Sequence, residues 1–417
     1  MKFILRIFAL IGFLTLIGIV IAYGRGYRWS PGKKSLTSTG ILAVNSSPKA
    51  AKIYINGVLR GVTDTNLILP PDNYQVEIKK DGYTSWTKTI KLQGELVYSA
   101  DAQLFPLNPS LSPLTNLGIV KTYPVDQTEK IIIFSDKDDP LKDGIYLFET
   151  TKRPLSLLPP LKLIILKKDL PITDLDFTKT NVYLSPDYKE AIFDFNYGVV
   201  DNRAYLFSLD KDNDNLFEVT TSKDTLLTAW EEERTKEVLK ILETFPKEVV
   251  KVASDSFNII SFSPDKTKIL YQPKINLQLP EVIKPPLIAI NQTEEERNLL
   301  INYFYVYDRK EDKNYRISNL EFLISNKIPS PKFQLDQLGQ LEISNLVSWF
   351  PDSKHLVFAE EKKISIIDYD DKNKQTLYSG PFEKPFFIVT TDGNIAVSAN
   401  LNPDTNVFPD LYLVGIR

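Results

Sequence analysis

The stretch SFSPDKTKILY, residues 261–271, decides the fold of the larger part of the chain. Its Ser-Pro-Asp turn leads through Lys268 into the apolar run Ile269, Leu270 and Tyr271. Proline and aspartate favour a tight turn, and a short apolar run beside a turn signal is typical of a buried strand. The stretch therefore predicts two buried strands joined by a turn.

The same unit recurs along the chain, and each copy is followed by an aromatic strand. Two further clear copies lie at residues 183–193 and 349–358, and weaker copies lie at residues 124–133 and 391–397. The aromatic strands are residues 144–148, 204–207, 303–307, 364–369 and 411–414. Four-stranded units of this kind bury their faces by stacking radially, which predicts a β-propeller at residues 118–417. At roughly 40–45 residues a blade, and with two insertions subtracted, there is room for about five blades.

The repeat resembles the TolB-like and WD-repeat-like propellers, in which Ser-Pro-Asp is followed by glycine and then by an apolar strand. In this chain Tyr188, Lys266 and Ser353 stand where those families have the glycine. The blade number and the closure of the ring therefore stay open.

Residues 224–253 interrupt the repeat with helical periodicity, placing Leu227, Trp230 and Ile241 on one face. Pro246 ends this helix and can open a second, short one. A helix packed on the rim of the propeller is the simpler interpretation, and a partner-binding helix is the alternative.

A second insertion, residues 273–301, is long, irregular and rich in proline. Loops of this length inside a domain are usually functional or disordered. We expect a partner to bind across the propeller mouth and this segment, and the candidate binding residues in the segment are Pro280, Lys284, Pro285 and Pro286.

The N-terminal residues 3–23 form an unbroken apolar run with a single charge, Arg6. At about 1.5 Å per residue the run is about 31 Å long, which suits a bilayer core of about 30 Å. Its apolar core exceeds the roughly 7–15 residues of a signal peptide, and residues 22–24 make a poor cleavage site. We expect residues 1–24 to be a retained anchor that contacts the lipid bilayer, followed by a linker at residues 25–37. A cleaved signal peptide is the alternative.

The orientation of this anchor has two opposing indications. Arg25, Arg28, Lys33 and Lys34 follow the apolar run, which by the positive-inside rule places the large domain in the cytoplasm. A lone N-terminal apolar segment before a long folded domain is instead the usual layout of an exported protein. We expect a single-pass protein of the cell membrane with an extracytoplasmic large domain, and the conflict stays open.

Residues 38–107 predict a small antiparallel β-sandwich. Residues 52–55 and 74–79 alternate apolar and polar side chains, and Asn56-Gly57 is a strong hairpin signal. Further strands are expected at residues 87–92 and 96–104.

This region resembles the PEGA domain of prokaryotic envelope proteins. The resemblance is carried by residues 44–48, 51–57, 61–63, 69–71, 74–76 and 80–83. Asp64 and the pair Asp72-Asn73 depart from the family pattern, both in turns. The resemblance implies an extracytoplasmic β-module without established catalysis.

The charge and composition exclude several classes of function. Residues 35–417 carry 44 basic and 53 acidic side chains, so binding to nucleic acid is unfavourable. The chain has no cysteine for disulfides or thiolate metal sites, and His355 is its single histidine. His355 follows a repeat turn, so we expect it to be exposed and not catalytic. The acidic run at residues 210–218 lacks the glycine and glutamate of a calcium loop, so a solvated turn is expected.

We therefore expect a non-catalytic binding or scaffold protein of the cell envelope, with no cofactor, no metal and no catalytic residue. Its partner would be an envelope protein or polysaccharide. The alternative is a propeller-type hydrolase or lyase that acts on an envelope polymer through carboxylates.

Overall fold

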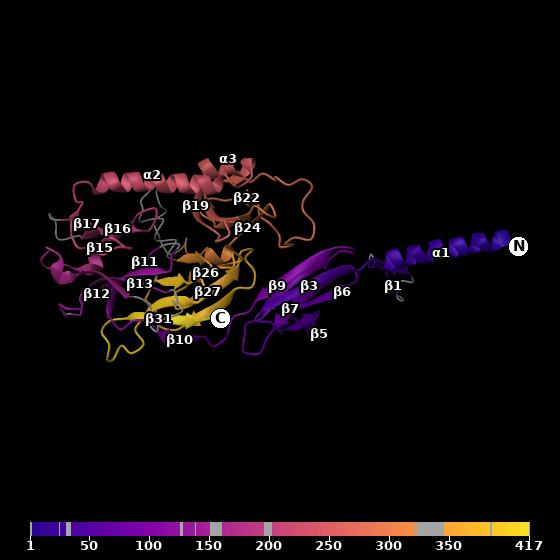
Figure 1. The fold of residues 1–417 in the computed structure, drawn as a ribbon, viewed down its shortest axis with the longest axis horizontal. Coiled ribbons are helices and arrows are strands. Elements are labelled where there is room, and N and C mark those ends of the chain that lie inside the picture. Colours follow the sequence, from indigo (N-terminus) through magenta and orange to yellow (C-terminus); the bar gives the residue numbers. More distant parts are fainter. Residues whose placement is uncertain are drawn as a thin grey trace. The chain divides into compact units, whose positions relative to one another are not determined.

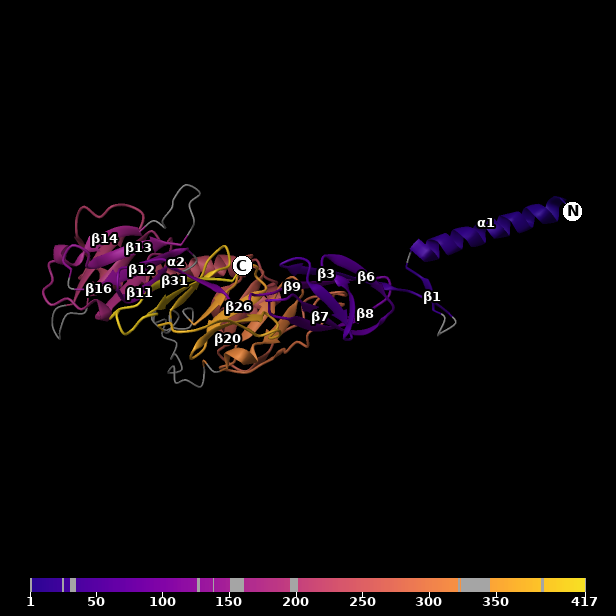
Figure 2. The ribbon, with the colours of Figure 1, turned by 90° about the horizontal axis from the view of Figure 1, so that it is seen from below.

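The computed structural model describes residues 2–24, 26–30, 35–125, 128–137, 139–150, 161–195, 202–321, 323, 346–383 and 386–416. The chain divides into two compact units (Figures 1 and 2). The first unit contains Met1–Asn108 and Ile283–Glu294, and the second contains Pro109–Val282 and Glu295–Arg417. The protein is mostly β with an N-terminal helix, as the sequence predicts. Residues 283–294 lie within the range predicted for the propeller but belong instead to the first unit.

Helix α1 (Lys2–Gly24) contains a stretch, Arg6–Gly24, that is long and apolar enough to cross a membrane. None of this 19-residue stretch is buried in protein, and at about 1.5 Å per residue it is about 28 Å long. A short antiparallel hairpin of β1 (Arg28–Ser30) and β2 (Ser35–Thr37) follows it. The predicted linker therefore contains a pair of strands; Arg25, Lys33 and Lys34 lie outside the described residues.

The first unit contains a β-sandwich of a three-stranded sheet, in the order β6-β3-β9, and a four-stranded sheet, in the order β5-β4-β7-β8. The alternating side chains of β3 and β7 bury Leu42, Val44, Val76 and Ile78 between the two sheets. One expectation is wrong, because β3 and β9 pair in parallel. The strands are β3 (Gly40–Ser47), β4 (Lys52–Ile55), β5 (Val58–Val62), β6 (Thr65–Leu69), β7 (Asp72–Lys79), β8 (Trp86–Leu92) and β9 (Val97–Gln103).

The described part of the second unit contains five four-stranded sheets, in agreement with the predicted number of about five blades. The first is β11 (Ile119–Val125), β12 (Lys130–Ser135), β13 (Gly144–Glu149) and β14 (Leu161–Leu166), and the second is β15 (Thr180–Leu184), β16 (Glu190–Phe195), β17 (Arg203–Ser208) and β18 (Phe217–Glu218). The third is β19 (Phe257–Phe262), β20 (Lys268–Pro273), β23 (Tyr305–Asp308) and β24 (Lys313–Arg316), and the fourth is β25 (Val347–Trp349), β26 (His355–Ala359), β27 (Lys363–Asp368) and β28 (Gln375–Ser379).

The fifth sheet joins the two ends of the second unit. Its strands are β10 (Ser110–Pro113), β31 (Asp410–Gly415), β30 (Ile395–Ala399) and β29 (Phe387–Val389), in that order. Strand β10 pairs antiparallel with β31, so the propeller begins before the predicted residue 118. Short elements outside these sheets are the pair β21 (Leu277–Gln278) and β22 (Asn298–Leu299) and the 3-10 helices η1 (Lys167–Asp169), η2 (Phe177–Lys179) and η3 (Ser318–Leu320).

The repeated turns have the predicted common geometry. Pro186, Pro264 and Pro351 each precede the second strand of a sheet, and each of those strands is buried. At the position of the family glycine, Tyr188, Lys266 and Ser353 have φ angles of 56°, 56° and 60°. These residues therefore adopt the left-handed conformation that glycine takes without strain.

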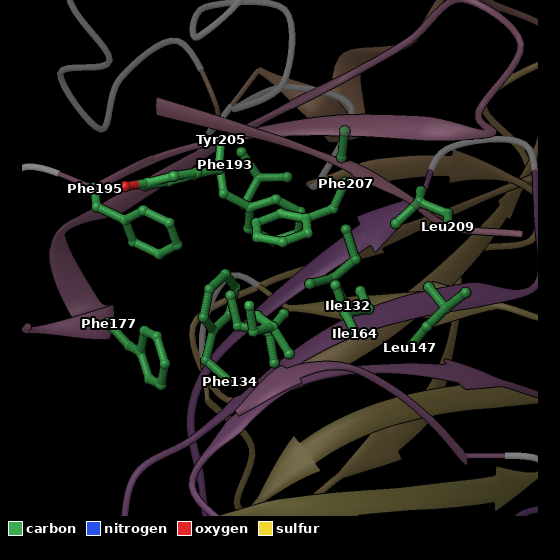
Figure 3. Close-up of a cluster of buried hydrophobic side chains, with 14 of the residues drawn as sticks. Ile132, Phe134, Leu147, Ile164, Phe177, Phe193, Phe195, Tyr205, Phe207 and Leu209 are labelled. Carbon is green, nitrogen blue, oxygen red and sulfur yellow. The ribbon is translucent and has the colours of Figure 1, made fainter. Parts of the chain in front are cut away.

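Side chains of neighbouring sheets form the core of the propeller. Figure 3 shows one cluster, in which Phe134 of the first sheet lies with its ring centroid 5.9 Å from that of Phe193 of the second. Phe177 packs on the same ring of Phe134, at 5.4 Å. Packing between the apolar side chains of neighbouring sheets therefore holds one sheet against the next.

The predicted helical insertion is present as α2 (Lys223–Leu242) and α3 (Lys247–Ser256), with Pro246 between them. Leu227 and Trp230 near the start of α2 pack on the second sheet, and Leu242 at its end packs on the third. The helix therefore bridges two sheets of the propeller, which agrees with the simpler interpretation of the insertion.

Candidate functional site

The four candidate binding residues do not lie together. Pro280 is half-buried in the second unit, whereas Lys284, Pro285 and Pro286 are exposed in the segment that belongs to the first unit. Leu287 and Ile288 continue this exposed stretch, with 41% and 68% of their surface accessible. We call residues 284–288 the tip. The tip presents one cation and four apolar side chains to solvent.

The residues of the 273–301 segment on either side of the tip, which we call the stem, are held together by Arg297. Its guanidinium donates to the carbonyl oxygen of Pro280 at 2.7 Å and also to the carbonyl oxygen of Asp312. Its Nε atom lies 2.8 Å from a carboxylate oxygen of Glu295, and the Arg297 side chain is only 9% exposed. The N–H groups of a guanidinium point in fixed directions. A buried guanidinium that donates to several backbone carbonyls therefore fixes the positions of those carbonyls relative to one another. Residues near Arg297 are therefore part of the propeller fold.

The return segment after the tip is fixed to the sandwich of the first unit. The side-chain amide of Gln292 accepts from the backbone N–H of Lys91 at 2.7 Å and donates to the Lys91 carbonyl at 2.9 Å. Lys91 lies on β8, the edge strand of the four-stranded sheet. Ala289 packs against the hydrophobic core of the same sandwich. Gln292 therefore satisfies both backbone groups of an edge residue that would otherwise bind water or another strand.

Helix α1 joins the sandwich through a short, hydrogen-bonded junction. Both the backbone N–H and the hydroxyl of Thr39 donate to the carbonyl oxygen of Gly26, at 3.0 Å and 2.6 Å. The hydroxyl of Tyr27 donates to Glu95 at 2.8 Å. Arg28 donates to the carbonyl of Tyr23 and stacks on the Tyr23 ring, with its guanidinium carbon 3.8 Å from the centroid. A cation at this place is favourable, because the last carbonyls of a helix carry partial negative charge.

The expectation that His355 is exposed is wrong, because its side chain is buried and only 7% exposed. Its Nδ1 atom lies 2.6 Å from an oxygen of Asp352, and its Nε2 atom lies 3.1 Å from an oxygen of Asp368. Burial opposes a charge here, but the hydrogen bonds to the two carboxylates outweigh it and raise the pKa of His355 to about 10. The ring is therefore an imidazolium at neutral pH that joins a repeat turn to the end of β27.

Polar contacts also join the turns of the third and fourth sheets. The hydroxyl of Ser353 accepts from the backbone N–H of Asp265 at 3.0 Å. Burial acts against ionisation of Asp265, but hydrogen bonds from Ser263, Thr267 and Lys310 hold its pKa well below the usual range. Asp265 therefore acts as a permanent acceptor within the turn.

The acidic run forms the predicted turn up to residue 216, and its last acidic residue, Glu218, lies on β18. Asp210 pairs with Lys130 at 2.7 Å, Asp212 lies 3.7 Å from Lys162, and the Asn213 amide bonds to the backbone of Ser208. In the described part of the chain, no group of three or more histidine, cysteine, aspartate or glutamate side chains could hold a metal ion.

Comparison with known proteins identifies the first β-module. The family model of the PEGA domain matches residues 39–108. The chain contains a PEGA domain. The match begins at Thr39, the residue bonded to Gly26, so a direct hydrogen bond joins the start of the PEGA domain to the residue two positions after α1. The departures at Asp64 and Asp72-Asn73 lie at a turn and at the start of β7, and the strands form despite them.

Solved structures similar to the chain include TolB from Acinetobacter baumannii, at 11% identity and a TM-score of 0.20. The alignment covers 84% of this chain, and the chain spans 62% of that TolB chain. A structural genomics protein of unknown function from Bacteroides thetaiotaomicron is 9% identical over 88% of this chain and 91% of its own, with a TM-score of 0.27. None of the curated proteins matches the chain. The propeller assignment therefore rests on the five sheets and their repeated turns.

Proposed function

We propose that the protein is a non-catalytic binding or scaffold protein of the cell envelope, anchored in the membrane by α1 with its β-units on the extracytoplasmic side. The observation that carries this proposal is the junction between an exposed apolar helix and a PEGA domain, made by Gly26 and Thr39. A helix of about 28 Å matches the hydrocarbon core of a bilayer, and burying its apolar surface in lipid is favourable. A domain joined so closely to the helix would lie beside the membrane surface.

The tip, residues 284–288, is the proposed contact with a partner. Exposed apolar side chains beside proline are already restricted in conformation, so binding would lose little conformational entropy. The tip is followed by Ala289 and Gln292, which fix the chain to the PEGA domain. Its partner would be an envelope protein or polysaccharide that covers Leu287 and Ile288.

A hydrolase or lyase is less favoured by the carboxylates of the described chain. A general acid needs a carboxyl group whose pKa is raised towards neutrality. The described carboxyl groups whose pKa departs from its usual value all lie below that value: Asp64, Asp176, Asp187, Asp265, Asp352 and Glu360. These groups are suited to accept hydrogen bonds and pair with cations.

The proposal is tested by quantitative capture of envelope components with the full chain in detergent. The test variant carries Leu287→Ser and Ile288→Ser. The matched control carries Ile275→Ser, since Ile275 is also an exposed apolar residue, 56% accessible, on the stem. We expect a component that the wild type and the control capture and the tip variant loses. Equal capture by all three proteins would contradict the role of the tip, and turnover of an envelope polymer by the wild type would contradict a non-catalytic scaffold.

A further inference from the structure

An apolar row crosses the outer face of the three-stranded sheet of the PEGA domain. Ile68 on β6, Ile41 on β3 and Val97 on β9 are direct register partners in neighbouring strands. Ile68 and Val97 are each 57% exposed, and Ile41 is half-buried between them. The three side chains occupy the face opposite the core, because Leu42, the next residue along β3, is fully buried.

The rows that follow along the same face are small or polar. The next row is Asn66, Ala43 and Ser99. In the row after it the Asn45 amide donates to the Asp101 carboxylate at 2.9 Å. The polarity of this face therefore changes along the strands, from apolar beside Gly40 to hydrogen-bonded and charged further on.

The apolar row is the row closest along β3 to the end of α1. Thr39, which binds the Gly26 carbonyl, precedes Ile41 by two residues, or about 7 Å along an extended strand. Gly26 in turn follows the last residue of α1, Gly24, by two residues. The backbone of Ile41 and the backbone of Thr39 also bond to Leu96 and Glu95, which lead into Val97. The whole apolar row therefore lies close to the point where the apolar helix ends.

We propose that Ile41, Ile68 and Val97 form a lipid-contacting surface of the PEGA domain, which dips into the interfacial region of the bilayer spanned by α1. The inference rests on the proposed membrane anchor and adds a second contact with the same membrane. The occupant is a lipid surface, because on this face of the sheet the apolar side chains adjoin the membrane helix and the polar ones lie away from it. An interfacial contact of this kind buries apolar side chains about 5–10 Å into the headgroup boundary. It would fix the orientation of the domain on the membrane.

The chain has no cysteine, so single cysteines can carry a fluorescent probe without a background signal. The full chain is reconstituted into phosphatidylcholine vesicles that contain a lipid with a nitroxide quencher near the headgroup. Probes at Ile68→Cys and Val97→Cys report the proposed surface. Probes at Asn66→Cys and Ser99→Cys, on the next row of the same face, are the matched controls. A probe at Leu14→Cys, with a deep-chain quencher, tests the anchor itself, and circular dichroism checks that each variant folds.

We expect quenching at positions 68 and 97 to exceed that at positions 66 and 99 by about twofold or more, as for a surface inserted into the headgroup region. Equal quenching at all four positions, with the Leu14→Cys probe quenched, would overturn the lipid contact and leave the anchor standing. A spectral blue shift at positions 68 and 97 without quenching would identify a second copy of the chain as the occupant and would also overturn the proposal. An unquenched Leu14→Cys probe would overturn both the anchor and the lipid contact.

Discussion

His355 occupies in the fourth sheet the register position that Lys268 occupies in the third. Each is the first residue of the second strand, and each lies opposite an aspartate at the end of the third strand: Asp368 for His355 and Asp308 for Lys268. Lys268 lies 3.2 Å from Asp308, and both side chains are less than a tenth exposed. The third and fourth sheets therefore share the same feature, a buried cation opposite an aspartate.

This relationship predicts how substitutions of His355 behave. His355→Gln removes the buried cation that lies between Asp352 and Asp368, and removing one partner of a buried ion pair destabilises a protein by about 3–5 kcal/mol. His355→Lys places in the fourth sheet the same cation that Lys268 supplies in the third, and it should recover part of the lost stability. Thermal unfolding of the full chain measures both. An equal loss for the two variants would show that the charge is not what the site needs.

The raised pKa of His355 predicts a pH dependence of stability. The pKa is about 10 in the folded protein and about 6.5 in an unfolded chain. The stabilisation is therefore fully present below about pH 6.5 and is lost as the pH rises towards 10. The wild type should lose stability over this interval, relative to the His355→Lys variant, because lysine stays protonated over more of it. Parallel curves for the two proteins would contradict a charged His355.

The left-handed turn residues predict a stabilising substitution. Lys266 has a φ of 56°, where an L-residue is strained and glycine is not. Lys266→Gly should raise the free energy of unfolding by up to about 1 kcal/mol, since relief of strain outweighs the added freedom of the unfolded chain. Lys189→Gly, beside the equivalent turn of the second sheet, replaces a residue without a positive φ and should destabilise instead. Destabilisation by both substitutions would contradict the claim that the positive φ of Lys266 strains the turn.

Arg297 should be essential for the stem of the 273–301 segment. Arg297→Met keeps the apolar stem of the side chain but loses the bonds to Pro280, Glu295 and Asp312, at an expected cost of about 3 kcal/mol. Limited proteolysis should then cut the segment faster. Arg309→Met, which loses a bond from an exposed guanidinium to Thr244, is the control and should change cleavage little.

Gln292→Glu tests the link between the tip segment and strand β8. The carboxylate can still accept from the Lys91 N–H but faces the Lys91 carbonyl without a donor. Hydrogen exchange at Lys91 should quicken, with a loss of about 1 kcal/mol in local opening free energy. Gln278→Glu, an exposed change on β21, is the matched control. Unchanged exchange in the Gln292→Glu variant would contradict the capping role.

Local patterns in the sequence predict most strands and both helices of the insertion, since turns, alternation and helical periodicity are local signals. Contacts between distant residues are not predicted in this way. The β10 strand is only four residues long and exposed throughout, and it pairs with β31 near the other end of the chain. The parallel pairing of β3 with β9 depends on strand order, which periodicity does not specify.

Local sequence signals mark only some features of the candidate site. Proline content marks the 273–301 segment, but it does not reveal that Gln292 binds Lys91, 201 positions away. Arg297 gave one weak signal, as a lone cation after Glu294, Glu295 and Glu296. The burial of His355 was missed because a residue beside a turn usually faces solvent. Its two aspartate partners become neighbours only once β26 and β27 pair.

The most direct test of the account is the accessibility of the PEGA domain in intact cells. Ser99→Cys places a single thiol on an exposed position of β9, and a membrane-impermeant maleimide reports which side of the membrane it faces. We predict that intact cells label fully and that the labelled, full-length chain stays in the carbonate-washed membrane fraction. Labelling that requires lysis, or a labelled chain that has lost residues 1–24 and leaves the membrane, would contradict an extracytoplasmic protein anchored by α1.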